Sequence, residues 1–166
     1  MCQLSDTRIL CQNADMRQDG VQLESSIGYL LKEVTSALRV AMEEALRPHG
    51  VSVSAYACLE LLAQRPGLSN SELARGTFVT RQSMNVMLQA LERDGLVTRP
   101  THAPVGKVLP ARLTERGTRI LGDASAAVRA VEVRMLAGLG DDDQAHTFRA
   151  LQLMARSLRA DGSATT

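Results

Sequence analysis

The chain has 166 residues, of which 45% are hydrophobic and 22% charged, a balance typical of an ordinary globular domain. Only 2% of the residues are aromatic. Leucine, valine, methionine and alanine must therefore fill the core, which favours packed helices over a β-sandwich. The net charge of +1 excludes a uniformly basic protein, and no apolar stretch is long enough to predict a signal peptide or a membrane span.

Cysteine and histidine usage argues against disulfide and metal sites. Cys2, Cys11 and Cys58 cannot all pair within one chain, and none lies at the spacing of a zinc site. The three histidines fall in different predicted elements, and no nucleophile elbow, phosphate loop or paired-histidine motif is present. We therefore expect a cytoplasmic protein that is not an enzyme and that has no metal and no cofactor.

The charge is unevenly distributed along the chain. Residues 75–119 contain eight Lys/Arg and three Asp/Glu, a net charge of +5, whereas residues 1–74 contain six and nine, a net charge of −3. A basic block in a neutral chain is either a solvated face or an electrostatic contact surface, and the pattern inside the block must decide between them.

The first predicted elements are two helices. Residues 1–23 are expected to be a flexible extension, because charges interrupt every apolar run. From Ile27 to Leu46 apolar residues recur at helical spacing, and Pro48 and Gly50 end that helix. The run from Ser54 to Gln64 is apolar nearly all round, which predicts a central core helix.

A pair of short capped helices follows the break at residues 65–67. Ser69 and Glu72 have the spacing of a capping box, which predicts a helix that extends to about Arg75. Thr80 can cap a second helix, from Arg81 to Asp94. Two capped helices joined by a few residues that include a glycine are typical of a helix-turn-helix.

The second of these helices has two chemically different faces. Met84, Met87, Leu88 and Leu91 share one side, and the opposite side contains Arg81, Gln82, Asn85 and Gln89. Guanidinium and amide groups match the major-groove edges of guanine and adenine, so this face can read bases. An ordinary solvated helix face is the alternative interpretation.

A β-wing is predicted after the helix. Gly95 ends the helix, residues 96–99 predict a strand, and residues 107–113 predict a second strand beyond a loop with Pro100, Pro104 and Gly106. The wing would bring Arg99, His102 and Lys107 towards DNA phosphates or a minor groove.

Two long helices complete the predicted fold. Thr114 can cap the first, whose apolar stripe extends from Ile120 to Met135, and Asp141–Asp143 provide negative charge at the start of the second. Residues 161–166 are expected to be a disordered tail. The predicted fold class is mostly α, with a small two- or three-stranded wing on a winged helix-turn-helix.

Over residues 24–160 this order of elements resembles the MarR family of bacterial regulators. The stretches that carry the resemblance are LSNSELARGTFVTRQSMNVMLQALERDGLVTR and LTERG. The resemblance implies dimerisation helices at residues 24–50 and 115–160, and a DNA-binding lobe at residues 51–114. It also implies a homodimer that binds double-stranded DNA at a pseudo-palindromic operator. Because members of the family are usually regulated in this way, the resemblance further implies that a small apolar or phenolic ligand, or cysteine oxidation, relieves repression.

The wing departs from the family pattern. Members usually have an Asp-x-Arg pair there, whereas this chain has Ala103-Pro104-Val105-Gly106-Lys107, and Pro110 interrupts the second predicted strand. The alternative function is therefore a winged-helix module for protein interaction or ligand binding, with weak or no DNA binding.

Two groups of candidate site residues follow. The candidate redox sensors are Cys11, in the extension, and Cys58. A harmless surface thiol is the alternative for Cys11, and inert core packing is the favoured interpretation of Cys58. The candidate DNA-binding residues are Ser69, Thr80, Arg81, Gln82, Ser83, Asn85, Gln89, Arg99, His102, Lys107 and Arg112.

Overall fold

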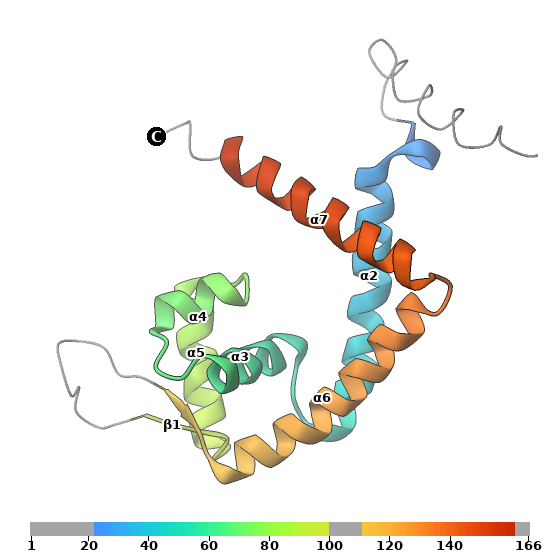
Figure 1. Ribbon diagram of the computed structural model, residues 1–166. Coiled ribbons are helices and arrows are strands. Elements are labelled where there is room, and N and C mark those ends of the chain that lie inside the picture. The colour runs from blue at the N-terminus through green and yellow to red at the C-terminus, as the bar shows by residue number, and fades with distance from the viewer. Residues whose placement is uncertain (1–21, 100–110, 162–166) are drawn as a thin grey trace, which may run out of the picture. The chain divides into compact units, whose positions relative to one another are not determined.

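The computed structural model describes residues 22–99 and 111–161, and it divides the chain into two compact units, residues 1–38 and 39–166. The described part of the first unit contains the 3-10 turn η1 (Leu23–Ser25) and the beginning of helix α2 (Ile27–Leu46). The second unit contains the end of α2 and the elements η2 (Arg47–His49), α3 (Val53–Gln64), α4 (Asn70–Gly76), α5 (Arg81–Arg93), β1 (Val97–Thr98), β2 (Arg112–Leu113), α6 (Glu115–Leu136) and α7 (Asp141–Asp161) (Figure 1). This mostly helical architecture with a two-stranded wing confirms the predicted fold class.

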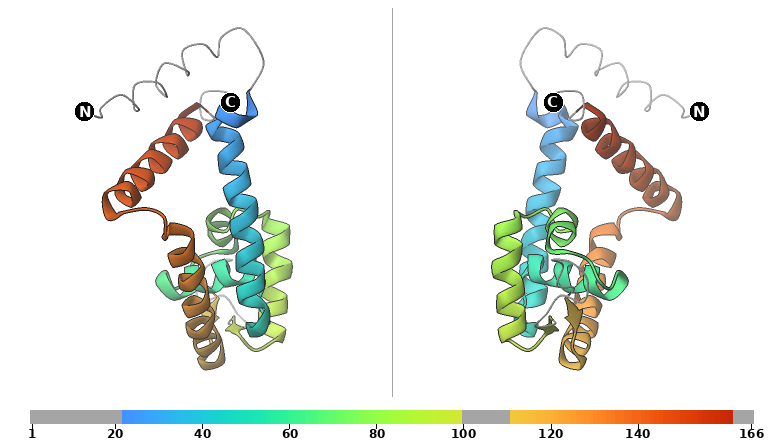
Figure 2. Two further views of the ribbon diagram at one scale, coloured as in Figure 1. Left: turned by 90° about the vertical axis from the view of Figure 1, so that its right-hand side faces the viewer. Right: turned by 90° about the vertical axis from the view of Figure 1, so that its left-hand side faces the viewer.

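The core of the second unit is built around α3, as predicted from its apolar sequence. The hydroxyl of Ser52 caps this helix by accepting a hydrogen bond from the backbone N–H of Ala55 (3.2 Å). Cys58 and Leu59 are fully buried within it. Figures 1 and 2 show α3 between α5 and α6, so its apolar surface is covered from both sides.

The helix-turn-helix forms through the local signals identified in the sequence. Both reciprocal hydrogen bonds of the Ser69–Glu72 capping box are present at the start of α4. The hydroxyl of Thr80 accepts from the backbone N–H of Ser83 (3.0 Å) at the start of α5. Leu73 and Met84 are both fully buried, so the two helices meet over the same core. Helix α5 ends one residue earlier than predicted, at Arg93.

An exposed phenylalanine occupies the turn between α4 and α5. Phe78 is 85% exposed and adopts a left-handed backbone conformation with φ of 57°. The backbone N–H of Val79 donates to the carbonyl of Ala74 (3.0 Å), and that of Phe78 donates to Arg75 (3.4 Å). This is the Schellman arrangement, in which glycine usually takes the left-handed position.

We expect Phe78→Gly to be more stable than Phe78→Ala by about 1 kcal/mol, because only the alanine keeps a Cβ atom in the left-handed region. Urea denaturation monitored by circular dichroism measures the free energy of unfolding of both variants. Since both substitutions remove the phenyl ring, the comparison isolates the backbone conformation. Equal stability of the two variants would contradict the assigned conformation.

The base of the wing is an antiparallel pair in which Val97 lies opposite Leu113 and Thr98 opposite Arg112. Of the second strand predicted over residues 107–113, only Arg112–Leu113 pairs within the described residues. The other predicted strand residues before Ala111, together with the altered wing sequence and Pro110, lie outside them.

The wing is joined closely to the first turn of α6. The hydroxyl of Thr114 accepts from the backbone N–H of Gly117 (2.9 Å), as predicted for a cap, and it donates to the carbonyl of Gly95 (2.7 Å). Gly117 is packed so closely that a Cβ atom there would lie 2.0 Å from the carbonyl oxygen of Leu96. The glycine is therefore required where α6 crosses the start of the wing.

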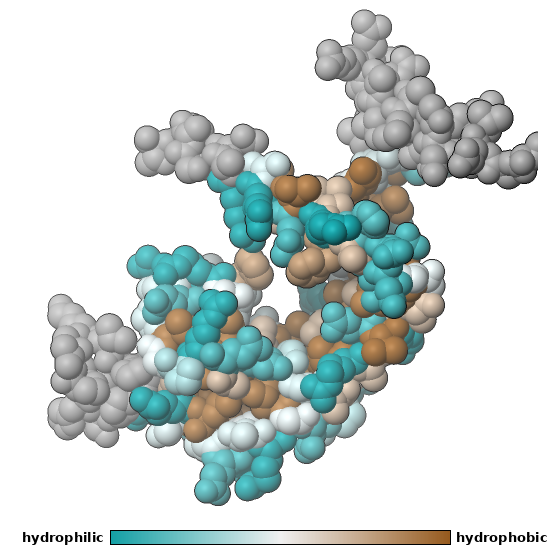
Figure 3. Space-filling model, viewed as in Figure 1, coloured by the Kyte–Doolittle hydropathy of each residue, from teal (hydrophilic) through white to brown (hydrophobic). Residues whose placement is uncertain are grey.

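The terminal helix leaves much of its apolar stripe uncovered. On α7, Phe148 is 63% and Leu158 is 77% exposed, and Figure 3 shows hydrophobic residues at the surface over this helix. Of the predicted tail at residues 161–166, Asp161 ends α7, and of the predicted extension at residues 1–23, Leu23 begins η1. Residues 1–21 and 162–166 lie outside the described part of the chain. Among the helices described, none is both long and apolar enough to cross a membrane.

Candidate nucleic-acid interface

Helix α5 has one buried and one exposed face, as the sequence predicted. Met84, Leu88 and Leu91 are at most 4% exposed and belong to the core. The exposed face contains all four predicted polar residues and three more side chains, and its members are Arg81, Gln82, Ser83, Asn85, Val86, Gln89 and Arg93. The amide and guanidinium groups of this face are thus available to a partner.

The N-terminal end of α5 suits an anionic partner. Its first turn has no acidic residue, and Arg81 is exposed at its first position. The free backbone N–H groups at a helix start contribute a partial positive charge at the same place. This end of the helix therefore combines a fixed positive potential with donors for hydrogen bonds.

The hydroxyl groups among the predicted contact residues have structural roles as caps. The hydroxyls of Thr80 and Ser83 are 2.8 Å apart, and Thr80 also holds the first turn of α5. The hydroxyl of Ser69 donates to Glu72 (2.6 Å), and hydrogen bonds from Ser69 hold the pKa of the Glu72 carboxyl below its ordinary value. The capping box is thus complete at neutral pH, and it weakens only in acid as Glu72 becomes protonated.

A side-chain contact aligns the starts of α4 and α5. The amide nitrogen of Asn70 donates to the backbone carbonyl of Arg81 (3.2 Å). The amide oxygen of Asn70 is buried and has no hydrogen-bond partner within the described chain. Asn70 therefore sets the position of the first residue of α5 from the neighbouring helix.

At the base of the wing, Arg99 turns back onto α5 rather than projecting freely. Its guanidinium donates to the carboxylate of Glu92 at 2.6 and 3.1 Å, and its side chain is only 19% exposed. Arg112, on the paired strand, is exposed. The other predicted wing contacts, His102 and Lys107, lie outside the described residues.

Two members of the exposed face were not predicted from the sequence. They are Val86, which is apolar, and Arg93, which lies at the far end of the helix. Both lie on the outward side of α5 by helical spacing, and this was the signal that could have identified them. Arg93 lies 4.0 Å from Asp94, and both side chains are largely exposed.

Cys58, one of the two candidate redox sensors, is a buried core thiol. Its sulfur lies 3.7 Å from the sulfur of Met84. Burial raises the pKa of this thiol from 9.0 to about 11, so the reactive thiolate is suppressed at neutral pH. Cys11, the other candidate, lies outside the described residues.

We expect Cys58 to resist iodoacetamide at pH 7 in the folded protein and to react fully in urea. Between pH 9 and pH 11 the unfolded thiol loses a proton that the folded thiol retains, so the free energy of unfolding should fall as the pH rises. Peptide mapping by mass spectrometry measures Cys58 separately from Cys2 and Cys11. Rapid modification of Cys58 in the folded protein would contradict its assignment as an inert core thiol.

A polar cluster joins α3 to α6 inside the second unit. The hydroxyl of Ser125 donates to the Glu60 carboxylate (2.9 Å), and the Tyr56 hydroxyl lies within hydrogen-bond distance of both, at 3.1 Å from Glu60 and 3.3 Å from Ser125. Burial raises the pKa of Tyr56, while the hydrogen bond to Ser125 and the charge of Arg129 act in the opposite direction. The cluster thus joins α3 to α6 through hydrogen bonds, and the charge of Arg129 makes the smallest contribution to the Tyr56 pKa.

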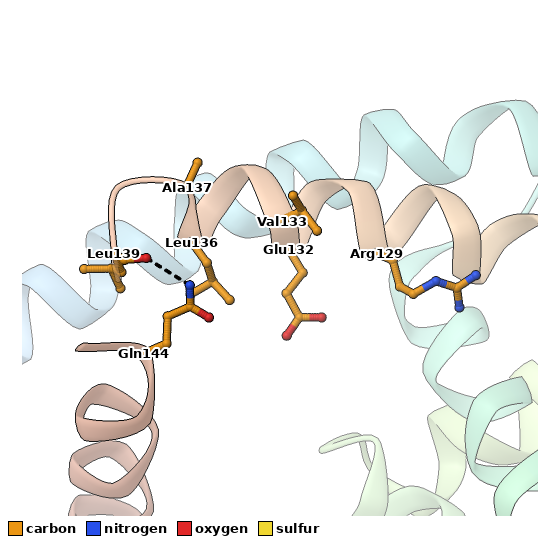
Figure 4. A pocket seen from close by; sticks show the side chains of 7 residues that line it. All are labelled: Arg129, Glu132, Val133, Leu136, Ala137, Leu139 and Gln144. Atoms are coloured by element: carbon orange, nitrogen blue, oxygen red, sulfur yellow. Dashed lines mark hydrogen bonds between the residues drawn. The ribbon is translucent and has the colours of Figure 1, made fainter. Parts of the chain in front are cut away.

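Arg129 also lines an open pocket of about 490 Å³ where α6 turns into α7. Figure 4 shows its guanidinium at one end and apolar side chains towards the turn, with Gln144 donating to the carbonyl of Leu139 (3.0 Å). The lining residues are Arg129, Glu132, Val133, Leu136, Ala137, Leu139 and Gln144. The pocket thus offers one cation, Arg129, and one carboxylate, Glu132, beside an apolar wall.

Clusters of three or more possible metal ligands do not occur within residues 22–99 and 111–161. The polar chemistry of the described chain is concentrated instead on α5, at the base of the wing and in the α3–α6 cluster.

The comparisons agree on one family. A model of the MarR family matches residues 49–107. The HTH-type transcriptional repressor Rv2887 of Mycobacterium tuberculosis is 42% identical over 133 residues, which cover 80% of this chain and 96% of that protein. The crystal structure of Rv2887 in complex with DNA has a TM-score of 0.66 at 42% identity, covering 78% of this chain and 97% of that one. Its complex with salicylic acid has a TM-score of 0.65 at 40% identity, covering 84% and 99%. The chain therefore belongs to the MarR family, and it is a DNA-binding transcriptional regulator rather than an enzyme.

Proposed function

We propose that this chain represses transcription by placing α5 in the major groove of a two-fold symmetric operator. The observation that carries the proposal is the exposed amide and guanidinium face of α5, opposite an apolar face on which Met84, Leu88 and Leu91 are buried and Met87 is partly buried. Its relative Rv2887, a transcriptional repressor, has been crystallised in complex with DNA. A protein that binds operator DNA in a bacterium acts in the cytoplasm.

Different residues of α5 are expected to contribute to DNA affinity and to sequence specificity. Arg81 can bind guanine or phosphate, and Gln82, Asn85 and Gln89 have the paired donor and acceptor that adenine requires. The hydroxyls of Ser69, Thr80 and Ser83 support the helix starts and can contact phosphates from there. On the wing, Arg112 is exposed for the backbone, whereas Arg99 acts through its ion pair with Glu92.

A homodimer is proposed because two helices leave apolar residues uncovered. On α2, Ile27 and Leu30 are each 50% exposed, and on α7 Phe148 and Leu158 are more exposed still. Apolar stripes of this kind on helices are typical of protein interfaces. A second copy covering them would also present two α5 helices to successive major grooves.

We propose a small aromatic acid as the effector, since Rv2887 has been crystallised with salicylic acid. In the α6–α7 pocket, Arg129 can bind a carboxylate while Val133 and Leu136 contact an aromatic ring.

Arg129→Ala should raise the salicylate concentration needed to release operator DNA about tenfold or more. The reason is that a charge-assisted hydrogen bond contributes about 1.5–3 kcal/mol. Fluorescence anisotropy of labelled operator, titrated with salicylate, measures the release. Arg134→Ala is the matched control, since Arg134 is exposed on the same helix and does not line the pocket. Equal release from both variants would show that the effector binds elsewhere.

The function is tested by selecting DNA from a random duplex pool with the purified full-length protein. We expect a two-fold symmetric motif, and we expect the logarithm of the binding constant to fall linearly with the logarithm of the salt concentration. Selection of no motif, or binding without salt dependence, would favour the alternative, a winged-helix module for protein interaction.

A further inference from the structure

Val86 is an apolar residue in the middle of the polar face of α5. Its side chain is 60% exposed, and it does not belong to the core cluster. Valine is a weaker helix former than alanine, so helix stability does not account for its presence. We propose that Val86 reads the C5-methyl group of a thymine in the operator; this rests on the proposed entry of α5 into the major groove.

The helical position of Val86 supports this role. At 3.6 residues per turn, Val86 lies about 40° from Gln82 around the helix axis and about 20° from Arg93. The buried residues Met84 and Leu91 lie on the opposite side. When Gln82 and Arg93 face the groove, Val86 must face it too.

The chemistry of the groove leaves one partner for an isopropyl group. Each base pair presents donors and acceptors in the major groove, and thymine alone adds an apolar group, its methyl. The neighbouring amides of Gln82 and Gln89 favour adenine, whose pairing partner is thymine. An A·T pair could therefore satisfy an amide on one strand and Val86 on the other.

The experiment uses the duplex that the wild-type protein selects from the random pool. Each thymine of a half-site is replaced in turn by deoxyuridine, symmetrically in both half-sites, which removes only the methyl group. At one position the substitution should lower the affinity of the protein for the duplex. The expected loss is about fourfold for each methyl group removed, and thus about tenfold or more when the methyl group is removed from both half-sites. Deoxyuridine in the flanks outside the half-sites serves as the matched control.

Variants of Val86 identify the residue responsible. Val86→Ala should bind the thymine and deoxyuridine duplexes with nearly equal affinity, whereas Val86→Thr keeps a methyl group and should keep the preference. Because Val86 is exposed, both variants should retain the wild-type circular dichroism spectrum and melting temperature.

The experiment distinguishes failure of the inference about Val86 from failure of the proposed function. Salt-dependent binding of a symmetric motif without methyl sensitivity, or with a sensitivity that Val86→Ala retains, would overturn the role of Val86 and leave the proposed function intact. Absence of any selected motif would overturn the proposed function and this inference together.

Discussion

The Arg81→Ala, Asn85→Ala double variant should lose specific DNA binding almost entirely. Each lost base contact costs about 1–3 kcal/mol, and a dimer loses both contacts twice. Since specific binding usually exceeds non-specific binding by about 4–10 kcal/mol, the combined loss should bring the selected duplex down to the affinity of random DNA. Competition binding with selected and random duplexes at fixed salt measures this ratio.

The fold should tolerate these substitutions, because both side chains are exposed on α5. A matched control replaces one arginine and one amide elsewhere, Arg65→Ala with Gln64→Ala, both exposed at the end of α3. That control should keep the wild-type preference for the selected duplex. If the α5 variant keeps it as well, α5 is not the recognition helix.

Gly117→Ala should destabilise the protein by about 3 kcal/mol or more. The new methyl group would lie 2.0 Å from a backbone carbonyl oxygen, that of Leu96, which cannot move aside as a flexible side chain can. Relief requires α6 to shift away from the wing, which also strains the hydrogen bond between the N–H of Thr114 and Leu96 (3.1 Å). Thermal and urea denaturation measure the loss.

Gly122→Ala is the control on the same helix. A Cβ atom at Gly122 meets no other atom within 4 Å, so this substitution should stabilise α6 by about 0.5–1 kcal/mol through helix propensity. Opposite signs for the two substitutions are therefore expected. A mild effect at Gly117 would show that α6 does not cross the wing as closely as the structure has it.

Local sequence signals were sufficient for most of the helices. The caps at Ser69, Thr80 and Thr114 were predicted and are present, because a cap involves residues three positions apart and depends little on the rest of the chain. The exposed face of α5 was predicted for a similar reason, since helical periodicity alone assigns the buried side.

Other features involve residues far apart in the sequence. The pairing of Arg99 with Glu92 places a predicted wing-tip cation against α5, and no local pattern indicates it. The cluster of Tyr56, Glu60 and Ser125 likewise forms only when α3 meets α6. Nothing in the sequence indicates that Phe78 adopts a left-handed backbone conformation, because the left-handed residue at a helix end is usually glycine.

The amino-acid sequence by itself determined where the helices begin, which side of each is apolar and which family the chain resembles, because these properties depend on neighbours within a turn or two. Only the tertiary structure decided which polar groups pair across elements and why Gly117 must lack a Cβ atom. Contacts of that kind depend on distances between elements, which are set by the packing of the whole core.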